Sequence, residues 1–264
     1  MNPSTAINFM TYNINYSRRA VEEYAQYSWE NRRGDVYKLI QSTESDVIFL
    51  QEVLSKNQDE VQASLSEHKW YFEPTNSRDG VCCNGIGIKR SFLPQEEPRE
   101  FSFNFNRFEK SAEKVMGVLI GDLCLLNAHC PMEEKGRMAM ASNFNHCLPN
   151  DREYRVIIAG DFNSFPDVRG QEQVETISTV TGAVRVSDLA IAESSKELAI
   201  RSFKAYPYDV VPEGALKLAG KLDHIFVKGL KLADKTTPIV LDAKIVEGMD
   251  FAPSDHYPIK AVLQ

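Results

Sequence analysis

The feature that most limits the fold of this chain is a series of short apolar runs, rich in Ile, Val, Leu and Phe, that recur along all 264 residues. Runs of this length, bounded by glycine, proline or polar residues, are typical of buried β-strands. They predict strands over residues 7–12, 46–50, 85–89, 115–120, 123–128, 154–159, 222–227 and 257–263. The sequence contains no internal repeat and no low-complexity segment, so we expect a globular fold.

Helical patterns lie between some of these strands. Segments 33–43 and 56–67 each place their large apolar residues on one face, and segment 133–147 has good helix formers before Pro149. Strands 115–120 and 123–128 follow each other so closely that they must pair antiparallel. We therefore expect an α/β protein with mixed sheets and helices outside.

No linker or second core is evident. The proline- and charge-rich stretch 92–100 is typical of a loop, and residues 1–264 are expected to form a single domain. With 43% apolar residues the chain has ample material for a core.

Charge and cysteine content limit the function classes. The chain has 30 Lys and Arg against 37 Asp and Glu, a net charge of −7, so a polyanion would have to be met by a local site. No apolar run approaches the roughly 18 residues of a membrane span, and the N-terminal segment is too often interrupted for a secretory signal. The five cysteines show no CxxC spacing, which indicates a reducing compartment. We expect a cytoplasmic protein without a transmembrane segment.

Polar side chains suited to chemistry stand where the predicted strands end or begin. Strand ends are rigid, so side chains placed there can converge with the precision that a catalytic site requires. The residues are Asn13, Glu52, His129, Asp161 with Asn163, Asp223, and Asp255 with His256.

The chemical character of this set is uniform. Carboxylates and carboxamides are the hard oxygen ligands that Mg²⁺ prefers, with Mn²⁺ as an alternative ion, and no Cys/His cluster has zinc spacing. Histidine titrates near neutrality and can carry protons or hold a phosphoryl group. Each residue alone would more often be a helix N-cap, a turn residue or a packed histidine. Six strand ends of one chemical type indicate metal-assisted hydrolysis of a phosphate ester.

The motifs around these residues resemble those of the endonuclease/exonuclease/phosphatase superfamily. This superfamily includes abasic-site endonucleases, DNase I, inositol-polyphosphate 5-phosphatases, neutral sphingomyelinases and deadenylases. The matching motifs are TYNI (11–14), LQEV (50–53), NAHC (127–130), GDFNSFPD (160–167), KLDHIF (221–226) and SDHYPI (254–259). The resemblance implies a four-layered α/β sandwich, in which two mixed β-sheets pack face to face with helices outside.

The resemblance also implies roles for the strand-end residues. Glu52 would be the principal Mg²⁺ ligand, with Asn13 nearby and Asp255 as a further metal-side carboxylate. Asp161 would orient the attacking water, Asn163 would hold a phosphate oxygen, and His129 would stabilise the phosphoryl charge. His256 would contact the scissile phosphate, with Asp223 fixing its orientation.

Some residues of this chain differ from the motifs of particular branches of the superfamily, and these differences indicate which branch it resembles most. Many abasic-site nucleases have aspartate where this chain has Asn15, and tyrosine where it has His129. The 5-phosphatase pattern is absent at residues 221–224. GDFNSFPD is most similar to the deadenylase-like and bacterial branch.

Two segments are candidates for a substrate rim. Segment 101–108 alternates aromatic and polar residues, including Phe103 and Arg107, and would stack bases if exposed. A strand or loop with one buried aromatic face is the preferred interpretation. Segment 16–33 gathers arginines and aromatics, including Arg18 and Arg32, and forms either a rim or the ordinary surface of a helix start.

The sequence thus predicts a Mg²⁺-dependent phosphodiesterase or nuclease acting on single-stranded nucleic acid or a nucleotide-like substrate. An alternative is a phosphatase or phospholipase-type hydrolase of phosphoinositide or sphingomyelin headgroups. A catalytically silent binding module is a third hypothesis, and the filled strand-end positions count against it. No protein partner is predicted.

Overall fold

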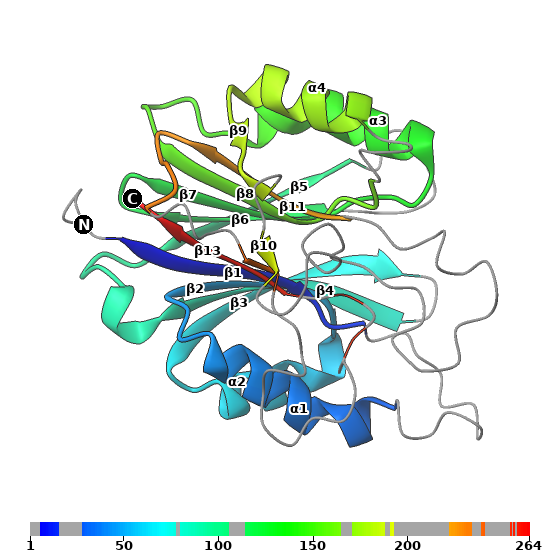
Figure 1. Cartoon of the computed structure of the whole chain (residues 1–264), viewed down its shortest axis with the longest axis vertical. Helices are drawn as coiled ribbons and strands as arrows, with labels where there is room; N and C mark the ends of the chain where they lie inside the picture. The colour runs from blue at the N-terminus through cyan, green and yellow to red at the C-terminus, as the bar shows by residue number, and fades with distance from the viewer. Residues whose placement is uncertain are drawn as a thin grey trace.

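The computed structural model describes residues 6–15, 28–77, 80–105, 114–164, 171–187, 191–192, 222–233, 239–240, 254, 256 and 258–264. Within these residues two mixed β-sheets lie face to face in the middle of the molecule, and helices cover the outer side of each (Figure 1). The expected α/β sandwich with four layers is confirmed.

The first sheet has seven strands, in the order β10-β12-β13-β1-β2-β4-β3. β1 lies near its centre, parallel to β2 on one side and antiparallel to β13 on the other. The strands are β1 (Ile7–Asn13), β2 (Val47–Leu54), β3 (His68–Ser77), β4 (Gly80–Lys89), β10 (Ile191–Ala192), β12 (Ile239–Val240) and β13 (Ile259–Leu263).

The second sheet has six strands, in the order β5-β6-β7-β8-β11-β9. Its centre is the parallel pair β7 and β8, flanked by antiparallel β6 and β11. The strands are β5 (Arg99–Asn104), β6 (Lys114–Ile120), β7 (Leu123–His129), β8 (Arg155–Asp161), β9 (Val184–Arg185) and β11 (Asp223–Lys228).

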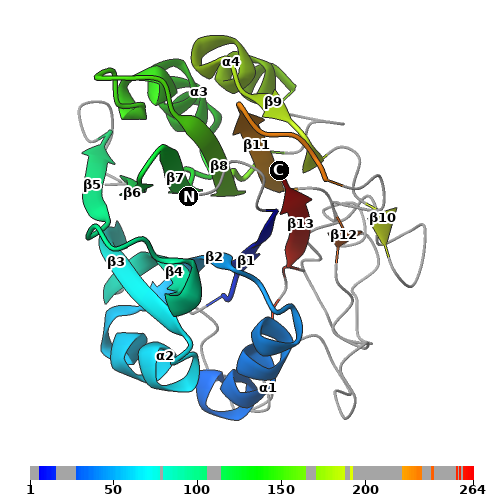
Figure 2. The ribbon, with the colours of Figure 1, turned by 90° about the vertical axis from the view of Figure 1, so that its left-hand side faces the viewer.

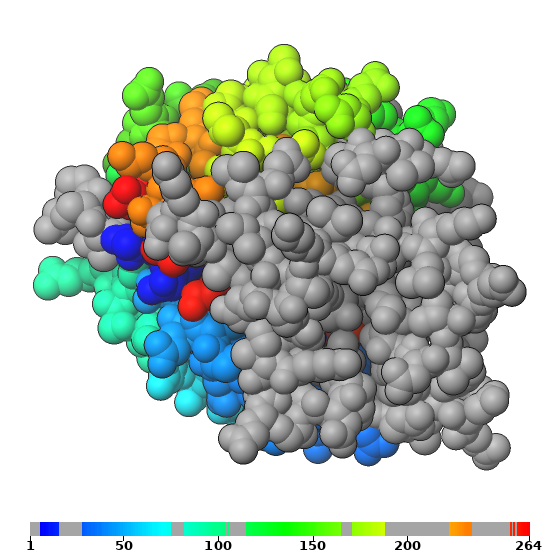
Figure 3. Space-filling view, in the orientation of Figure 1, coloured from blue at the N-terminus to red at the C-terminus, as the bar shows by residue number. Residues whose placement is uncertain are grey.

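The helices form the two outer layers. Viewed along a perpendicular direction, α1 and α2 lie against the first sheet and α3 and α4 against the second (Figure 2). The helices are α1 (Trp29–Ser42), α2 (Gln58–Ser64), α3 (Glu134–Asn143) and α4 (Gln171–Thr181), and the short 3-10 turns are η2 (Ser55–Asn57), η3 (Arg90–Phe92) and η4 (Phe144–Cys147). In the space-filling view, the surface of α4 stands above that of the β11 segment (Figure 3).

The main core fills the space between the sheets and beneath α1 and α2. Phe9 and Phe49 meet there edge to face, with ring centroids 4.8 Å apart. A second cluster lies between the other sheet and its helices, around Phe144 and Phe162. Burial raises the pKa of the Cys124 thiol in this cluster to about 12, so this cysteine packs as a protonated apolar side chain.

All eight predicted strands and the three predicted helices are present, with small differences at their ends. The close succession of β6 and β7 is an antiparallel pair turning at Gly121 and Asp122, as predicted. β3 and α4 were not predicted from the sequence, and the first residues of β5 were assigned to a loop. In the described part of the chain, no helix is both long and apolar enough to cross a membrane.

Candidate active site

The predicted strand-end residues converge from both sheets. β1 ends at Asn13 and β7 ends at His129, while β8 ends at Asp161. Glu52 lies near the end of β2. The parallel pairs β1–β2 and β7–β8 place their carboxyl ends at the same edge, so both sheets contribute to one site.

A β-bulge aims Glu52 into this site. The pairing of β2 with β4 shifts between Leu50 and Val53, so that two residues of β2 stand opposite one residue of β4. Glu52 has φ +60°, a left-handed conformation that a glutamate adopts at an energetic cost of the order of 1–2 kcal/mol. Such strained residues are concentrated at functional sites.

Gly160 allows β8 to deliver Asp161 beside His129. Asp161 pairs with His129 in the parallel register of β7 and β8. Gly160 has φ +142°, and a Cβ atom there would lie 1.9 Å from the carbonyl oxygen of Ala128. Only glycine permits this close approach of the two strands.

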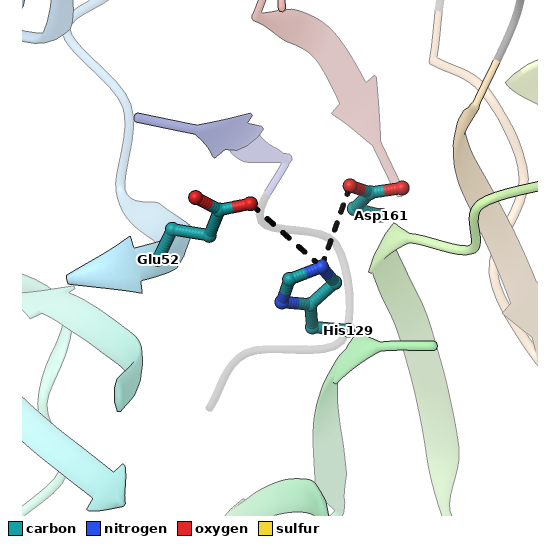
Figure 4. A group of neighbouring side chains, drawn as sticks. All are labelled: Glu52, His129 and Asp161. Atoms are coloured by element: carbon teal, nitrogen blue, oxygen red, sulfur yellow. Dashed lines mark ion pairs between the residues drawn. The ribbon is translucent and has the colours of Figure 1, made fainter. Parts of the chain in front are cut away.

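Glu52, His129 and Asp161 form a group that can hold a metal ion. One ligand atom from each lies within 4.8 Å of the others. Nε2 of His129 is 3.9 Å from Oε1 of Glu52 and 3.6 Å from Oδ2 of Asp161, and both lines meet at this ring nitrogen (Figure 4). Two carboxylates beside an imidazole fit a divalent cation such as Mg²⁺ or Mn²⁺.

Asn13 joins the two carboxylates. Its Nδ2 donates to Oε1 of Glu52 at 3.1 Å and to Oδ2 of Asp161 at 2.9 Å. Its Oδ1 accepts from the backbone N–H of Asn15, which fixes the orientation of the amide. The amide thus bridges the two acidic side chains, and the role of Asn13 as a neutral metal ligand stays a prediction.

His256 and Asp223 form a second buried pair at the same site. Nδ1 of His256 donates to Oδ2 of Asp223 at 2.9 Å, because a carboxylate can only accept. The pair therefore turns Nε2 of His256 toward the site, where it lies 3.6 Å from Oδ2 of Asp161. The family resemblance predicts that Asp223 orients His256 for catalysis, and that role stays a prediction.

Ser254 holds this pair against β1 and was not among the predicted site residues. Its hydroxyl donates to the backbone carbonyl of Asn13 at 2.8 Å and accepts from the backbone N–H of His256 at 3.2 Å. The available signal was its place in the motif SDHYPI, directly before the acidic residue and the histidine.

Asn163 lies in a tight turn after β8. Its backbone N–H donates to Oδ1 of Asp161 at 2.8 Å, its φ is +48°, and its Nδ2 donates to the carbonyl of Cys130 at 2.8 Å. The turn places Asn163 next to Asp161, and its role at a substrate phosphate stays a prediction.

Of the residues predicted to form a substrate rim, Arg32 and Phe103 pack inside the protein instead. Arg32 is only 1% exposed, and its guanidinium donates to the carbonyls of Ile14, at 2.5 Å, and Asn15. The prediction that Arg32 lies on a substrate rim is therefore wrong, because its buried guanidinium donates hydrogen bonds to backbone carbonyls just after β1. Phe103 packs against the second core cluster, which confirms the preferred buried-face interpretation. Arg18, Arg107 and Asp255 lie outside the described residues.

Comparison with known proteins identifies relatives of this fold. Residues 10–256 match the model of the Endonuclease/Exonuclease/phosphatase family. No curated protein sequence matches the chain.

Several solved structures are similar over almost their whole length. An endonuclease/exonuclease/phosphatase from Bacteroides vulgatus has a TM-score of 0.74 at 17% identity, covering 99% of each chain. A mannosyl-6-phosphatase from Bacteroides thetaiotaomicron has a TM-score of 0.69 at 14% identity, covering 98% of this chain and 99% of its own. TDP2 from D. rerio, complexed with a single-strand DNA product, has a TM-score of 0.67 at 14% identity, covering 99% of this chain and 100% of its own.

At these identities the likenesses show a shared fold, while the family match spans nearly the whole sequence and includes Asn13, Glu52, His129 and Asp161. The chain belongs to the endonuclease/exonuclease/phosphatase family, whose members are phosphoester hydrolases.

Proposed function

We propose that this protein is a divalent-cation-dependent phosphodiesterase that cleaves single-stranded nucleic acid or nucleotide-like phosphodiesters. The observation that carries the proposal is the convergence of Glu52, His129 and Asp161 with the oriented pair of His256 and Asp223. The likeness to a TDP2 structure that contains a single-strand DNA product supports the substrate class.

The residues divide the chemistry between them. Glu52 and Asp161 would hold the cation, which when bound would offset the negative charge that develops on the phosphoryl group. Asp161 also lies where it can orient water, and the hydrogen bond from Nδ1 of His256 to Asp223 turns Nε2 toward Asp161, where the phosphate would lie. His129 and Asn163 also lie beside Asp161 and complete the polar lining.

A matched panel of substrates tests this proposal. Hydrolysis would be measured with Mg²⁺ and with EDTA on single-stranded RNA and DNA, abasic duplex, bis-p-nitrophenyl phosphate, phosphoinositides, sphingomyelin and mannose 6-phosphate. We expect cation-dependent cleavage of the oligonucleotides. Absence of turnover on every substrate would favour the silent binding module and overturn the proposal.

Asp161→Ala is the diagnostic variant. We expect activity to fall by roughly 10²–10³ or more, since this variant loses both a holder of the cation that offsets the developing charge and the group that orients water. The thermal midpoint is expected to stay near the wild-type value, because losing the Asp161 hydrogen bonds is offset by removing a second carboxylate beside Glu52. Asp151→Ala removes an equal charge from the exposed turn before β8 and should retain activity. Full activity in Asp161→Ala would contradict the site assignment.

A phosphatase acting on a phosphorylated small molecule or headgroup is the second candidate. The likeness to a mannosyl-6-phosphatase, at a TM-score close to that of TDP2, favours it specifically. Turnover of mannose 6-phosphate or a lipid headgroup without oligonucleotide cleavage would keep the site residues and replace the substrate class.

We also propose a single domain over residues 1–264 and a cytoplasmic location. One core is shared by the facing sheets, which supports the single domain. All five cysteines are buried thiols, which supports a reducing compartment.

A further inference from the structure

A buried amide bridge crosses between the two sheets directly behind the candidate active site. It consists of Thr11 on β1, Gln51 on β2 and Asn127 on β7, and each of the three side chains is 0% exposed. Nε2 of Gln51 donates to Oγ1 of Thr11 at 3.1 Å and to Oδ1 of Asn127 at 2.7 Å. The bridge therefore links the three strands that also carry Asn13, Glu52 and His129.

Asn127 contacts the backbone at the bulge that aims Glu52. Its Nδ2 donates to the carbonyls of Leu50 and Gly85, both at 2.9 Å. These two residues are the last register partners of β2 and β4 before the pairing shifts around Glu52. A side chain from the second sheet thus hydrogen-bonds both strands of the first sheet at the bulge.

The orientation of the bridge is determined by its partners. Backbone carbonyls only accept, so the NH₂ group of Asn127 must face them and its oxygen must face Gln51. Gln51 then presents its own NH₂ group to Asn127 and Thr11. Its Oε1 is buried without a donor among the described residues. Packing alone would be served better by an apolar side chain, since a buried acceptor without a donor costs free energy.

On β1 and β7, the residues of the bridge lie two positions before the residues of the candidate site, further into the space between the sheets. Asn127 lies two residues before His129 on β7, and Thr11 lies two residues before Asn13 on β1, so each pair points to the same side of its strand. Gln51 directly precedes Glu52. If one sheet slid against the other, the hydrogen bonds of the bridge would break, and the same movement would separate Glu52 from His129.

We propose that Asn127, with Gln51, is a positioning residue that holds the Glu52 bulge in register with His129 and Asp161 and thereby sets the cation affinity of the site. This inference rests on the proposed function in one respect, namely that Glu52 helps to bind a divalent cation. Residues that do not touch the metal but hold its ligands in place typically support the metal affinity, which falls by roughly 10–100-fold when they are replaced.

The test compares Asn127→Leu with Leu125→Ala. Asn127→Leu keeps the branching and the number of heavy atoms of the side chain and removes the hydrogen bonds from Asn127 to the bulge. Leu125 is also fully buried on β7, two residues deeper and in the main core, so Leu125→Ala destabilises the same strand without removing a side-chain hydrogen bond to the bulge. Mn²⁺ binding would be measured directly by calorimetry, without turnover. We expect Asn127→Leu to raise the Mn²⁺ dissociation constant at least about 10-fold and Leu125→Ala to leave it unchanged.

Gln51→Met provides a second variant that keeps the side-chain length, in case Asn127→Leu does not fold. It should weaken Mn²⁺ binding in the same direction. An unchanged dissociation constant in a folded bridge variant, or an equal loss in Leu125→Ala, would overturn the inference.

Crystal structures separate failure of this inference from failure of the proposed function. If wild-type protein binds no Mn²⁺, the proposed cation site is wrong, but the bridge is still tested by the backbone of Glu52. We expect Glu52 to leave its positive φ in Asn127→Leu and to keep it in Leu125→Ala. A Glu52 that keeps its left-handed backbone beside His129 in Asn127→Leu would overturn the positioning role.

Discussion

At the scale of single residues, backbone conformations that most side chains avoid are concentrated around the site. Glu52 and Asn163 have positive φ, and so does Asn15 just after β1. Gly160 adds a fourth such position, where the carbonyl of Ala128 occupies the space of a side chain. The site is thus built on local conformations that only the surrounding sheets can maintain.

Replacing Gly160 by alanine tests this dependence. The added Cβ would overlap the Ala128 carbonyl, so β7 and β8 must separate at the point where His129 and Asp161 pair. We expect the free energy of unfolding to fall by about 2–4 kcal/mol and hydrolysis to be lost. Urea unfolding and turnover measure both effects.

Gly121→Ala is the matched control for Gly160→Ala. Gly121 has φ +58° in the turn between β6 and β7, and a Cβ added there would meet no atom within 4 Å. Its replacement should cost only about 1–2 kcal/mol, the cost of the left-handed backbone alone, and should retain activity. Equal losses in the two variants would show that the close approach at Gly160 is unimportant.

At the scale of elements, helix α1 supports the site through one of two adjacent arginines. Arg32 is buried and donates to the carbonyls that follow β1, with its guanidinium 5.4 Å from the ring centroid of Trp29. Arg33 points to the surface and pairs with Glu60 at 2.9 Å. The helix thus fixes the segment that carries Asn13 while its outer face carries an ordinary surface ion pair.

Arg32→Met and Arg33→Met form a matched pair of variants. Arg32→Met leaves two carbonyls without their donor, so we expect the free energy of unfolding to fall by about 2–4 kcal/mol and kcat to fall with it. Arg33→Met removes an exposed pair and should cost less than about 1 kcal/mol. Chemical denaturation and steady-state kinetics give the comparison. If Arg32→Met lost no more unfolding free energy than Arg33→Met, the proposed support of the site by Arg32 would be contradicted.

The elements also show what a sequence can and cannot predict. The apolar strands were predictable because their composition matches their burial, as in Val156–Ala159 of β8. α4 was missed because its β-branched residues have weak helix propensity, and its helix depends on packing Val174 and Ile177 against the second cluster. β3 was missed because Pro74 and polar residues interrupt its pattern.

Within the site, residue identity was predictable but orientation was not. Glu52, His129 and Asp161 were predicted because each follows an apolar strand, and they do lie together. The bridging amide of Asn13 depends on hydrogen bonds to Glu52 and Asp161, which are distant in the sequence, and the burial of Arg32 depends on a helix packing over the segment after β1. Both are tertiary contacts that spacing along the chain does not encode.

At the scale of the whole molecule, the candidate cation site joins the two sheets. Glu52 belongs to the first sheet, and His129 and Asp161 belong to the second. A cation bound by this group would link the halves of the sandwich and would bind the folded chain only. Ligand binding to the folded state stabilises it in proportion to the logarithm of the ligand concentration.

Thermal unfolding with and without Mn²⁺ tests this linkage. At a concentration roughly 100 times its dissociation constant, Mn²⁺ should add about 2.7 kcal/mol to the free energy of unfolding, and EDTA should reverse the effect. Glu52→Gln should abolish the increase while leaving the midpoint without metal close to the wild-type value. An equal Mn²⁺ response in Glu52→Gln would mean that the ion binds elsewhere.

The position of β13 beside β1 has a consequence for biosynthesis. β1 is made first, yet one of its edges is paired only when β13 arrives, and His256 emerges just before that strand. Until then a nascent chain on the ribosome exposes the backbone donors and acceptors of β1, which is the kind of edge that invites wrong pairing between chains. Completion of the first sheet and completion of the candidate site are therefore late events of synthesis, and a polypeptide interrupted before His256 would lack both β13 and the pair of His256 with Asp223.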